Sequence, residues 1–128
     1  MTSFLARAAV AVVIAASAGA AAAAECDVKK GEKVFKRCKA CHTLEADNNR
    51  TGPHLFGIVG RPVATVEGFN YSKPMKEFAA DGKTWDLALL DEFIKKPKKL
   101  VPGTIMRFNG LKKDQQRADL NCYLETIK

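Results

Sequence analysis

The sequence predicts an all-α fold in one small domain. Three segments place apolar residues at spacings of three and four, the period of a helix that buries one face, and a fourth short segment begins at a capping serine. These four segments are residues 28–39, 72–80, 84–96 and 111–128. No segment alternates apolar and polar residues for long enough to predict a strand. Irregular stretches 43–71 and 98–110 separate the helices, and a compact domain keeps such stretches only where they enclose something.

Residues 1–24 are expected to be a cleaved secretory signal peptide. Arg7 supplies a positive charge, an apolar run follows, and an Ala-x-Ala site ends at Ala24. A transmembrane anchor is the alternative, but the alanine-rich run is too weakly hydrophobic for the roughly 20 residues that a span requires. Cleavage leaves residues 25–128 as a single domain in the periplasm. Its formal net charge stays strongly positive, because only Arg7 is lost from the total of +7.

Residues 28–39 are expected to form an amphipathic helix with lysines on its outer face. Its inner positions are Val28, Gly31, Val34, Phe35 and Cys38. A glycine inside a helix costs about 1 kcal/mol relative to alanine. We therefore expect Gly31 to allow the close approach of another backbone.

The next five residues, Cys38-Lys39-Ala40-Cys41-His42, match the attachment signature of a c-type haem. Each thiol can add to a porphyrin vinyl group as a thioether, and the imidazole of His42 can then ligate the iron. A C-x-x-C pair also occurs in redox dithiols and in zinc sites. A zinc site would need two more ligands, and the remaining candidates, Cys26, His54 and Cys122, are isolated in the sequence. A redox dithiol of the thioredoxin type would need a βαβ pattern, which the sequence lacks.

The rest of the chain reads as loops and helices around that haem. Stretch 43–71 contains many glycines and prolines and would wrap the haem. Ser72 is the expected N-cap of helix 72–80. Helix 84–96 ends before Pro97, and its inner face consists of Leu87, Leu90, Phe93 and Ile94. Helix 111–128 carries an apolar stripe of Leu120, Tyr123, Leu124 and Ile127.

A second axial ligand would suit the haem to electron transfer, whereas an open position would suit it to binding gases or peroxide. The candidates are Met75, Met106 and His54. Met75 has the spacing of a core residue, and His54 follows His42 too closely to reach the opposite face easily. Met106 follows a lysine-rich loop and a Pro-Gly turn that could place its thioether over the far face. We favour Met106.

The motifs along residues 28–128 resemble class I cytochromes c, the small type shared by bacterial cytochromes c2 and mitochondrial cytochrome c. They are Gly31 with Phe35, C-K-A-C-H at 38–42, T-G-P at 51–53, G-R at 60–61, G-F-N-Y-S at 68–72, T-W at 84–85, K-P-K-K at 96–99, P-G-T-x-M at 102–106 and R-A-D-L-x-x-Y-L at 117–124. The resemblance implies the small cytochrome c fold, in which helices and loops wrap one covalently bound haem. Its N- and C-terminal helices would cross at Gly31, near Leu120 and Tyr123.

The resemblance also implies the roles of individual residues. Cys38 and Cys41 would hold haem c, with His42 and Met106 as the axial ligands of the iron. The Pro53 carbonyl would accept a hydrogen bond from the His42 ring and so raise its basicity. Buried propionates need polar partners, and the residues expected near them are Arg61, Tyr71, Trp85 and Thr104.

Three features depart from the family's pattern. Phe93 stands where the family usually has a tyrosine, and Ile105 replaces a lysine that is common in mitochondrial members. Cys26 and Cys122 are additional cysteines. Once haem has taken Cys38 and Cys41, an even number of cysteines remains in an oxidising compartment, so we expect a Cys26–Cys122 disulfide. Two unpaired thiols are the alternative.

The expected function is one-electron transfer between membrane respiratory or photosynthetic complexes or dehydrogenases, and not enzyme catalysis. A peroxidase-like haem enzyme or a ligand sensor is the alternative, and a subunit of a larger oxidoreductase is a weaker one. Lysines would steer the protein, expected to be a monomer, to redox partners with acidic surfaces. Such partners are a cytochrome bc1 complex, a terminal oxidase, a reaction centre or a dehydrogenase. Export argues against nucleic acid, and no stable membrane insertion is expected. The lysines concerned are Lys36, Lys39, Lys95, Lys96, Lys98, Lys99, Lys112 and Lys113.

Overall fold

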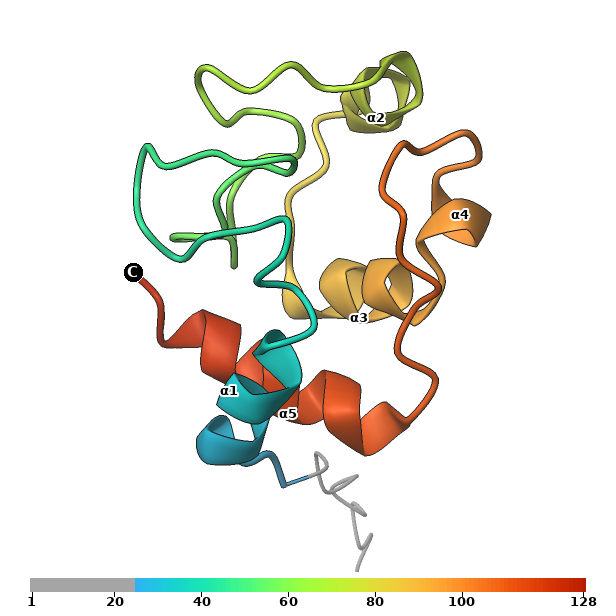
Figure 1. Ribbon diagram of the computed structural model, residues 1–128. Coiled ribbons are helices and arrows are strands. Elements are labelled where there is room, and N and C mark those ends of the chain that lie inside the picture. The colour runs from blue at the N-terminus through green and yellow to red at the C-terminus, as the bar shows by residue number, and fades with distance from the viewer. Residues whose placement is uncertain (1–24) are drawn as a thin grey trace, which may run out of the picture.

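The computed structural model describes residues 25–128, so the predicted signal peptide at 1–24 lies outside the described residues. Figure 1 shows helices linked by long loops. The helices are α1 (Val28–Phe35), α2 (Lys73–Ala79), α3 (Leu87–Lys95), α4 (Pro97–Leu100) and α5 (Asp114–Glu125). The extended pairing in this part of the chain is a single bridge between Pro62 and Thr84. The all-α prediction is confirmed, and none of the described helices is long and apolar enough to cross a membrane.

The first and last helices cross in close contact, as predicted (Figure 1). The crossing depends on Gly31, because a Cβ atom at this position would collide with the backbone carbonyl of Asp119 and would lie 2.7 Å from the Cβ of Tyr123. Phe35, one turn further along α1, is almost fully buried. Its ring centroid lies 5.9 Å from that of Tyr123. The predicted role of Gly31 is therefore confirmed.

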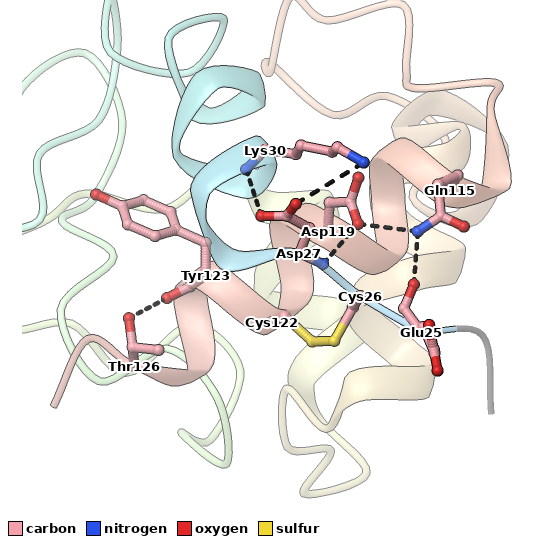
Figure 2. Close-up of a disulfide and its surroundings, with 9 residues drawn as sticks. All are labelled: Glu25, Cys26, Asp27, Lys30, Gln115, Asp119, Cys122, Tyr123 and Thr126. Carbon is pink, nitrogen blue, oxygen red and sulfur yellow. Dashed lines mark hydrogen bonds and ion pairs between the residues drawn. A yellow bond between two sulfur atoms is a disulfide. The ribbon is translucent and has the colours of Figure 1, made fainter.

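A disulfide between Cys26 and Cys122 ties the start of the described chain to α5 (Figure 2). The two Cα atoms lie 6.2 Å apart, within the range that a disulfide can bridge. Hydrogen bonds flank it on both sides. The Asp27 N–H donates to Asp119 Oδ1 at 2.9 Å, and Gln115 Nε2 donates to the carbonyl of Glu25 at 2.8 Å. The predicted pairing is confirmed.

Arg117 links α5 to α3 from inside the protein. Its side chain is only 3% exposed, and its Nε donates to Asp91 of α3 at 2.8 Å. Its Nη1 donates to the carbonyl of Leu111 at 2.9 Å, and its Nη2 donates to Asp114 at 2.6 Å. A buried guanidinium requires this many acceptors, because an unpaired buried charge is strongly destabilising. The end of the loop before α5 is thus attached to both helices.

The long loop between α1 and α2 is ordered by backbone contacts with distant segments. The N–H of Gly57 donates to Ile127, beyond α5, at 3.0 Å. Near the Pro62–Thr84 bridge, the N–H of Trp85 donates to Arg61 and the N–H of Gly60 donates to Trp85, each at 2.8 Å. These bonds place Arg61 beside Trp85.

The helices are shorter than the sequence predicts at several ends. Helix α1 stops at Phe35 instead of residue 39, because the N–H groups of residues 36–38 bond to carbonyls three positions back, which tightens the chain into turns. Helix α3 starts after its N-cap Asp86, since Thr84 is engaged with Pro62. Helix α4 was predicted as loop. Pro97 occupies its first turn, where a missing N–H is tolerated.

Candidate haem site

The C-x-x-C-H residues form a tight turn directly after α1. The N–H groups of Cys41 and His42 both donate to the carbonyl of Cys38, at 3.1 and 3.0 Å. Both thiols are unbonded, with Cys38 half-buried and Cys41 exposed. The turn therefore presents two thiols and one imidazole from five consecutive residues.

Burial disfavours ionisation of the free Cys38 thiol. Burial raises the pKa of Cys38 to about 11, with the positive charge of Arg37 opposing the rise. Zinc ligands and catalytic dithiols depend on thiolates, whose pKa is lowered by their surroundings. In the described part of the chain, no three histidine, cysteine or acidic side chains gather to form a metal site. A thioether carries no charge and therefore does not require a cysteine whose pKa is lowered.

The His42 ring is oriented from two sides by residues 52 and 53. Its Nδ1 donates to the carbonyl of Pro53 at 2.7 Å, which leaves Nε2 with the lone pair that a ligand needs. Gly52 lies against the ring, so closely that a Cβ there would come within 2.8 Å of Nδ1. Burial lowers the pKa of His42, and the bond to Pro53 opposes that effect. The lowered pKa favours the neutral form of the ring, and the hydrogen bond favours the tautomer with its Nε2 unprotonated.

The three candidates for the second axial position lie in different settings. His54 follows Pro53 directly, on the side of the molecule from which the His42 ring is held. Its N–H donates to Asn49, and its Nδ1 is buried without a partner. Met75 lies in α2, and Met106 lies in the loop between α4 and α5; both are partly buried against the core. In Figure 1 that loop and the turn after α1 run on opposite sides of the centre of the molecule.

Two of the residues expected near the propionates, Arg61 and Tyr71, have donor groups that their hydrogen bonds within the chain leave free. Arg61 directs Nη1 to the carbonyl of Phe56 and Nη2 to that of His54, each at 3.0 Å, which leaves its other N–H groups available. The hydroxyl of Tyr71 accepts the N–H of Val66 at 3.1 Å, so its own proton remains to donate. Burial raises the pKa of Tyr71 and lowers that of Arg61.

Trp85 and Thr104, the other two residues expected near the propionates, lie in different surroundings from each other. Trp85 is buried between aromatic rings, with centroids 5.1 Å from Phe93 and 6.1 Å from Phe78. Thr104 Oγ1 accepts the N–H of Met106 at 3.2 Å, which shapes the turn before the methionine. Thr104 therefore orders the methionine's own loop.

Sequence reasoning missed two contacts at this site. Gly52 was part of a recognised motif, but its packing against His42 has no sequence signature beyond the Gly-Pro pair. The guanidinium of Arg37 lies over the ring of Phe108, 5.6 Å from its centroid. These residues are 71 positions apart, and neither type specifies the other.

Fold and site together define the class of small c-type haem proteins: a tight turn after the first helix presents the C-x-x-C-H residues, and long loops surround that turn. Comparisons with known proteins support this class. A model of the family described as "Cytochrome c" matches residues 28–128, so the chain belongs to the cytochrome c family. Its members carry haem c covalently and transfer electrons, which decides against the enzyme alternative.

Individual relatives cover nearly the whole domain. Cytochrome c of Stellaria longipes is 48% identical over 103 residues, which is 79% of this chain and 93% of that protein. Cytochrome c-550 of Ancylobacter novellus is 44% identical over 99 residues, or 77% of this chain and 92% of the relative.

Solved structures agree with the fold. Ferricytochrome c2 from Rhodopseudomonas palustris superposes with a TM-score of 0.73 at 35% identity, over 80% of this chain and 99% of that one. Cytochrome cH from Methylobacterium extorquens gives a TM-score of 0.71 at 40% identity, over 78% and 98%. The predicted small cytochrome c fold is confirmed.

Proposed function

We propose that this electron carrier uses one haem c, bound through thioethers to Cys38 and Cys41 and ligated by His42 and Met106. When bound, the haem supplies an iron that cycles between the ferric and ferrous states. The observation that carries the proposal is the bond from His42 Nδ1 to the Pro53 carbonyl, at 2.7 Å. It fixes the tautomer in which Nε2 can ligate iron, and Gly52 fixes the plane of the ring.

Met106 is the better second ligand because its loop lies across from the His42 turn (Figure 1). A thioether there would keep both axial positions filled in both oxidation states, so little would rearrange when an electron is transferred. His54 directly follows Pro53, whose carbonyl holds the His42 ring, and Met75 lies within α2. Arg61, Tyr71, Trp85 and Thr104 are proposed to surround the propionates, where the free N–H groups of Arg61 would offset the cost of burying carboxylates.

The test compares two methionine variants. Met106→Ala should abolish the weak far-red band of methionine-ligated ferric haem and should let cyanide or carbon monoxide bind the iron. Met75→Ala, the matched control, should keep the band and exclude both ligands. The opposite pattern, with the band lost only in Met75→Ala, would refute the ligand assignment.

The partners are proposed to be redox proteins with acidic surfaces, such as a cytochrome bc1 complex, a terminal oxidase, a reaction centre or a dehydrogenase. All eight lysines of the predicted docking set are exposed. Charge steering is weakened by salt, so electron transfer to a purified partner should slow as ionic strength rises. Lys39→Glu with Lys99→Glu should slow it at low salt. If the rate changes neither with ionic strength nor with the two substitutions, these lysines do not steer the protein to its partner and serve only to keep it soluble.

The protein is proposed to work in the periplasm after its signal peptide has been cleaved between Ala24 and Glu25. The Cys26–Cys122 disulfide supports this location, because disulfides persist in oxidising compartments. The N-terminal sequence of the protein recovered from the periplasm should begin at Glu25. Recovery of a chain that retains residues 1–24 would contradict the proposal.

A further inference from the structure

The loop that carries Met106 is anchored at its two ends. We call residues 102–109 the ligand loop. Before it, Val101 is buried in the core; after it, Leu111 is buried too, and its N–H donates to Ile94 of α3 at 2.8 Å. Gly110 lies directly against the backbone of Lys95. The ends of the loop therefore cannot move far without unpacking the core.

Between those ends, the ligand loop is weakly attached. Within residues 25–128, its hydrogen bonds are local: Thr104 N–H donates to Val101 at 3.0 Å, and Met106 N–H donates to Thr104 Oγ1. No hydrogen bond joins it to another segment of the described chain. Near its start, Gly103 approaches Pro74 of α2 closely. The position of Met106 therefore depends on side-chain contacts.

Phe108 makes a directional contact from this loop to the opposite side of the site. The guanidinium of Arg37 lies 5.6 Å from the centroid of its ring, within the range of a cation–π interaction. Arg37 immediately precedes Cys38 in the turn that carries the C-x-x-C-H residues. Within the described chain the Arg37 side chain makes no ion pair, and its charge faces the ring of Phe108. The contact thus joins the two segments that are proposed to ligate the iron.

We propose that Arg37 is a positioning residue that keeps the ligand loop closed over the haem through its contact with Phe108. This inference rests on the proposed ligation by Met106. An external ligand can reach the iron only when the loop swings out and Met106 leaves. Loss of an exposed cation–π contact should therefore raise the population of the open loop by about two- to five-fold.

The experiment measures how fast imidazole replaces methionine on the ferric iron, followed by loss of the far-red band. Arg37→Gln should speed replacement by about two- to five-fold. Lys33→Gln is the charge-matched control, because Lys33 is an exposed cation one helical turn earlier in α1. It should leave the rate unchanged. Equal rates in Arg37→Gln and Lys33→Gln would overturn the proposal.

A double-mutant cycle isolates the contact from general effects of charge or packing. Phe108→Leu removes the aromatic face and should also speed replacement. In that background, Arg37→Gln should have no further effect, because its partner is gone. A full additional effect would show that Arg37 acts in another way, and the proposal would fall.

A second readout separates this proposal from the ligand assignment. Hydrogen exchange of the Thr104 and Met106 amides, the hydrogen-bonded amides of the ligand loop, should be faster in Arg37→Gln than in Lys33→Gln, whichever residue ligates the iron. A wild-type protein without the far-red band would refute Met106 ligation and leave the exchange comparison intact. Unchanged exchange in a protein that has the band would refute only the role of Arg37.

Discussion

The helical frame of α1, α3 and α5 and the loops around the haem site are stabilised in different ways. The helices of the frame are joined directly to one another by three features: the disulfide, the close approach at Gly31 and the buried Arg117. The loops are joined by scattered backbone hydrogen bonds, and the side chains of Arg61 and Tyr71 keep N–H and O–H donors that these bonds do not use. A change in the frame should therefore appear as lost stability, and a change in the loops as an altered haem site.

The largest expected effect comes from breaking the frame at its disulfide. The bond spans a sequence separation of 96 residues, and closing a loop of that length stabilises a protein by about 4–5 kcal/mol on the chain-entropy account. Cys26→Ser with Cys122→Ser should lower the free energy of unfolding by about that amount, measured by guanidinium denaturation. The far-red band should not change.

Mass spectrometry provides the control for that experiment. Alkylation of the wild-type haem protein without reduction should add no groups, and alkylation after reduction should add two, because Cys26 and Cys122 then become available. Two groups added before reduction would mean that the bond is absent.

A smaller effect is expected from a matched pair of glycine variants, each adding one methyl group. Gly31→Ala forces a Cβ into the carbonyl of Asp119, and overpacking of this kind costs about 1–3 kcal/mol of stability. The haem spectrum should remain that of the wild type. Gly52→Ala instead forces a Cβ into the ring of His42, which should shift the reduction potential and weaken the bond to Pro53.

Guanidinium denaturation and a redox titration on both variants decide whether the two regions are separable. The expected result is a larger loss of stability in Gly31→Ala and a larger shift of potential in Gly52→Ala. If Gly31→Ala shifts the reduction potential as much as Gly52→Ala does, a change in the frame alters the haem site. The proposed separation between a frame that sets stability and loops that set the properties of the haem would then be wrong.

Much of the frame is predictable from the sequence because its determinants are local or repeat along a helix. Apolar spacing indicates α1, α3 and α5, and Ser72 caps α2 as predicted, accepting the N–H of Met75. The exact ends are less predictable. Helix α1 stops at Phe35 because the following N–H groups turn toward nearer carbonyls, and α4 forms from four residues whose pattern resembles a loop.

The candidate site also has features that the sequence predicts and features that it does not. The thiols and His42 follow from the spacing of one pentapeptide, which dictates its own chemistry. The contact between Arg37 and Phe108 and the packing of Gly52 on His42 depend on how distant segments meet, and residue type alone does not determine that. Ile105, a departure from the family's usual lysine, is 63% exposed, so it places an apolar side chain beside Met106 on the surface.

The disulfide also changes the topology of the polypeptide. Because Cys26 and Cys122 are bonded, the backbone from one to the other is a closed covalent ring that contains α1 to α4, most of α5, and both the C-x-x-C-H turn and the ligand loop. A protease that cuts once anywhere in this ring opens it but releases no fragment. The severed ends remain tethered at a high effective concentration, so a nicked loop can return to its place.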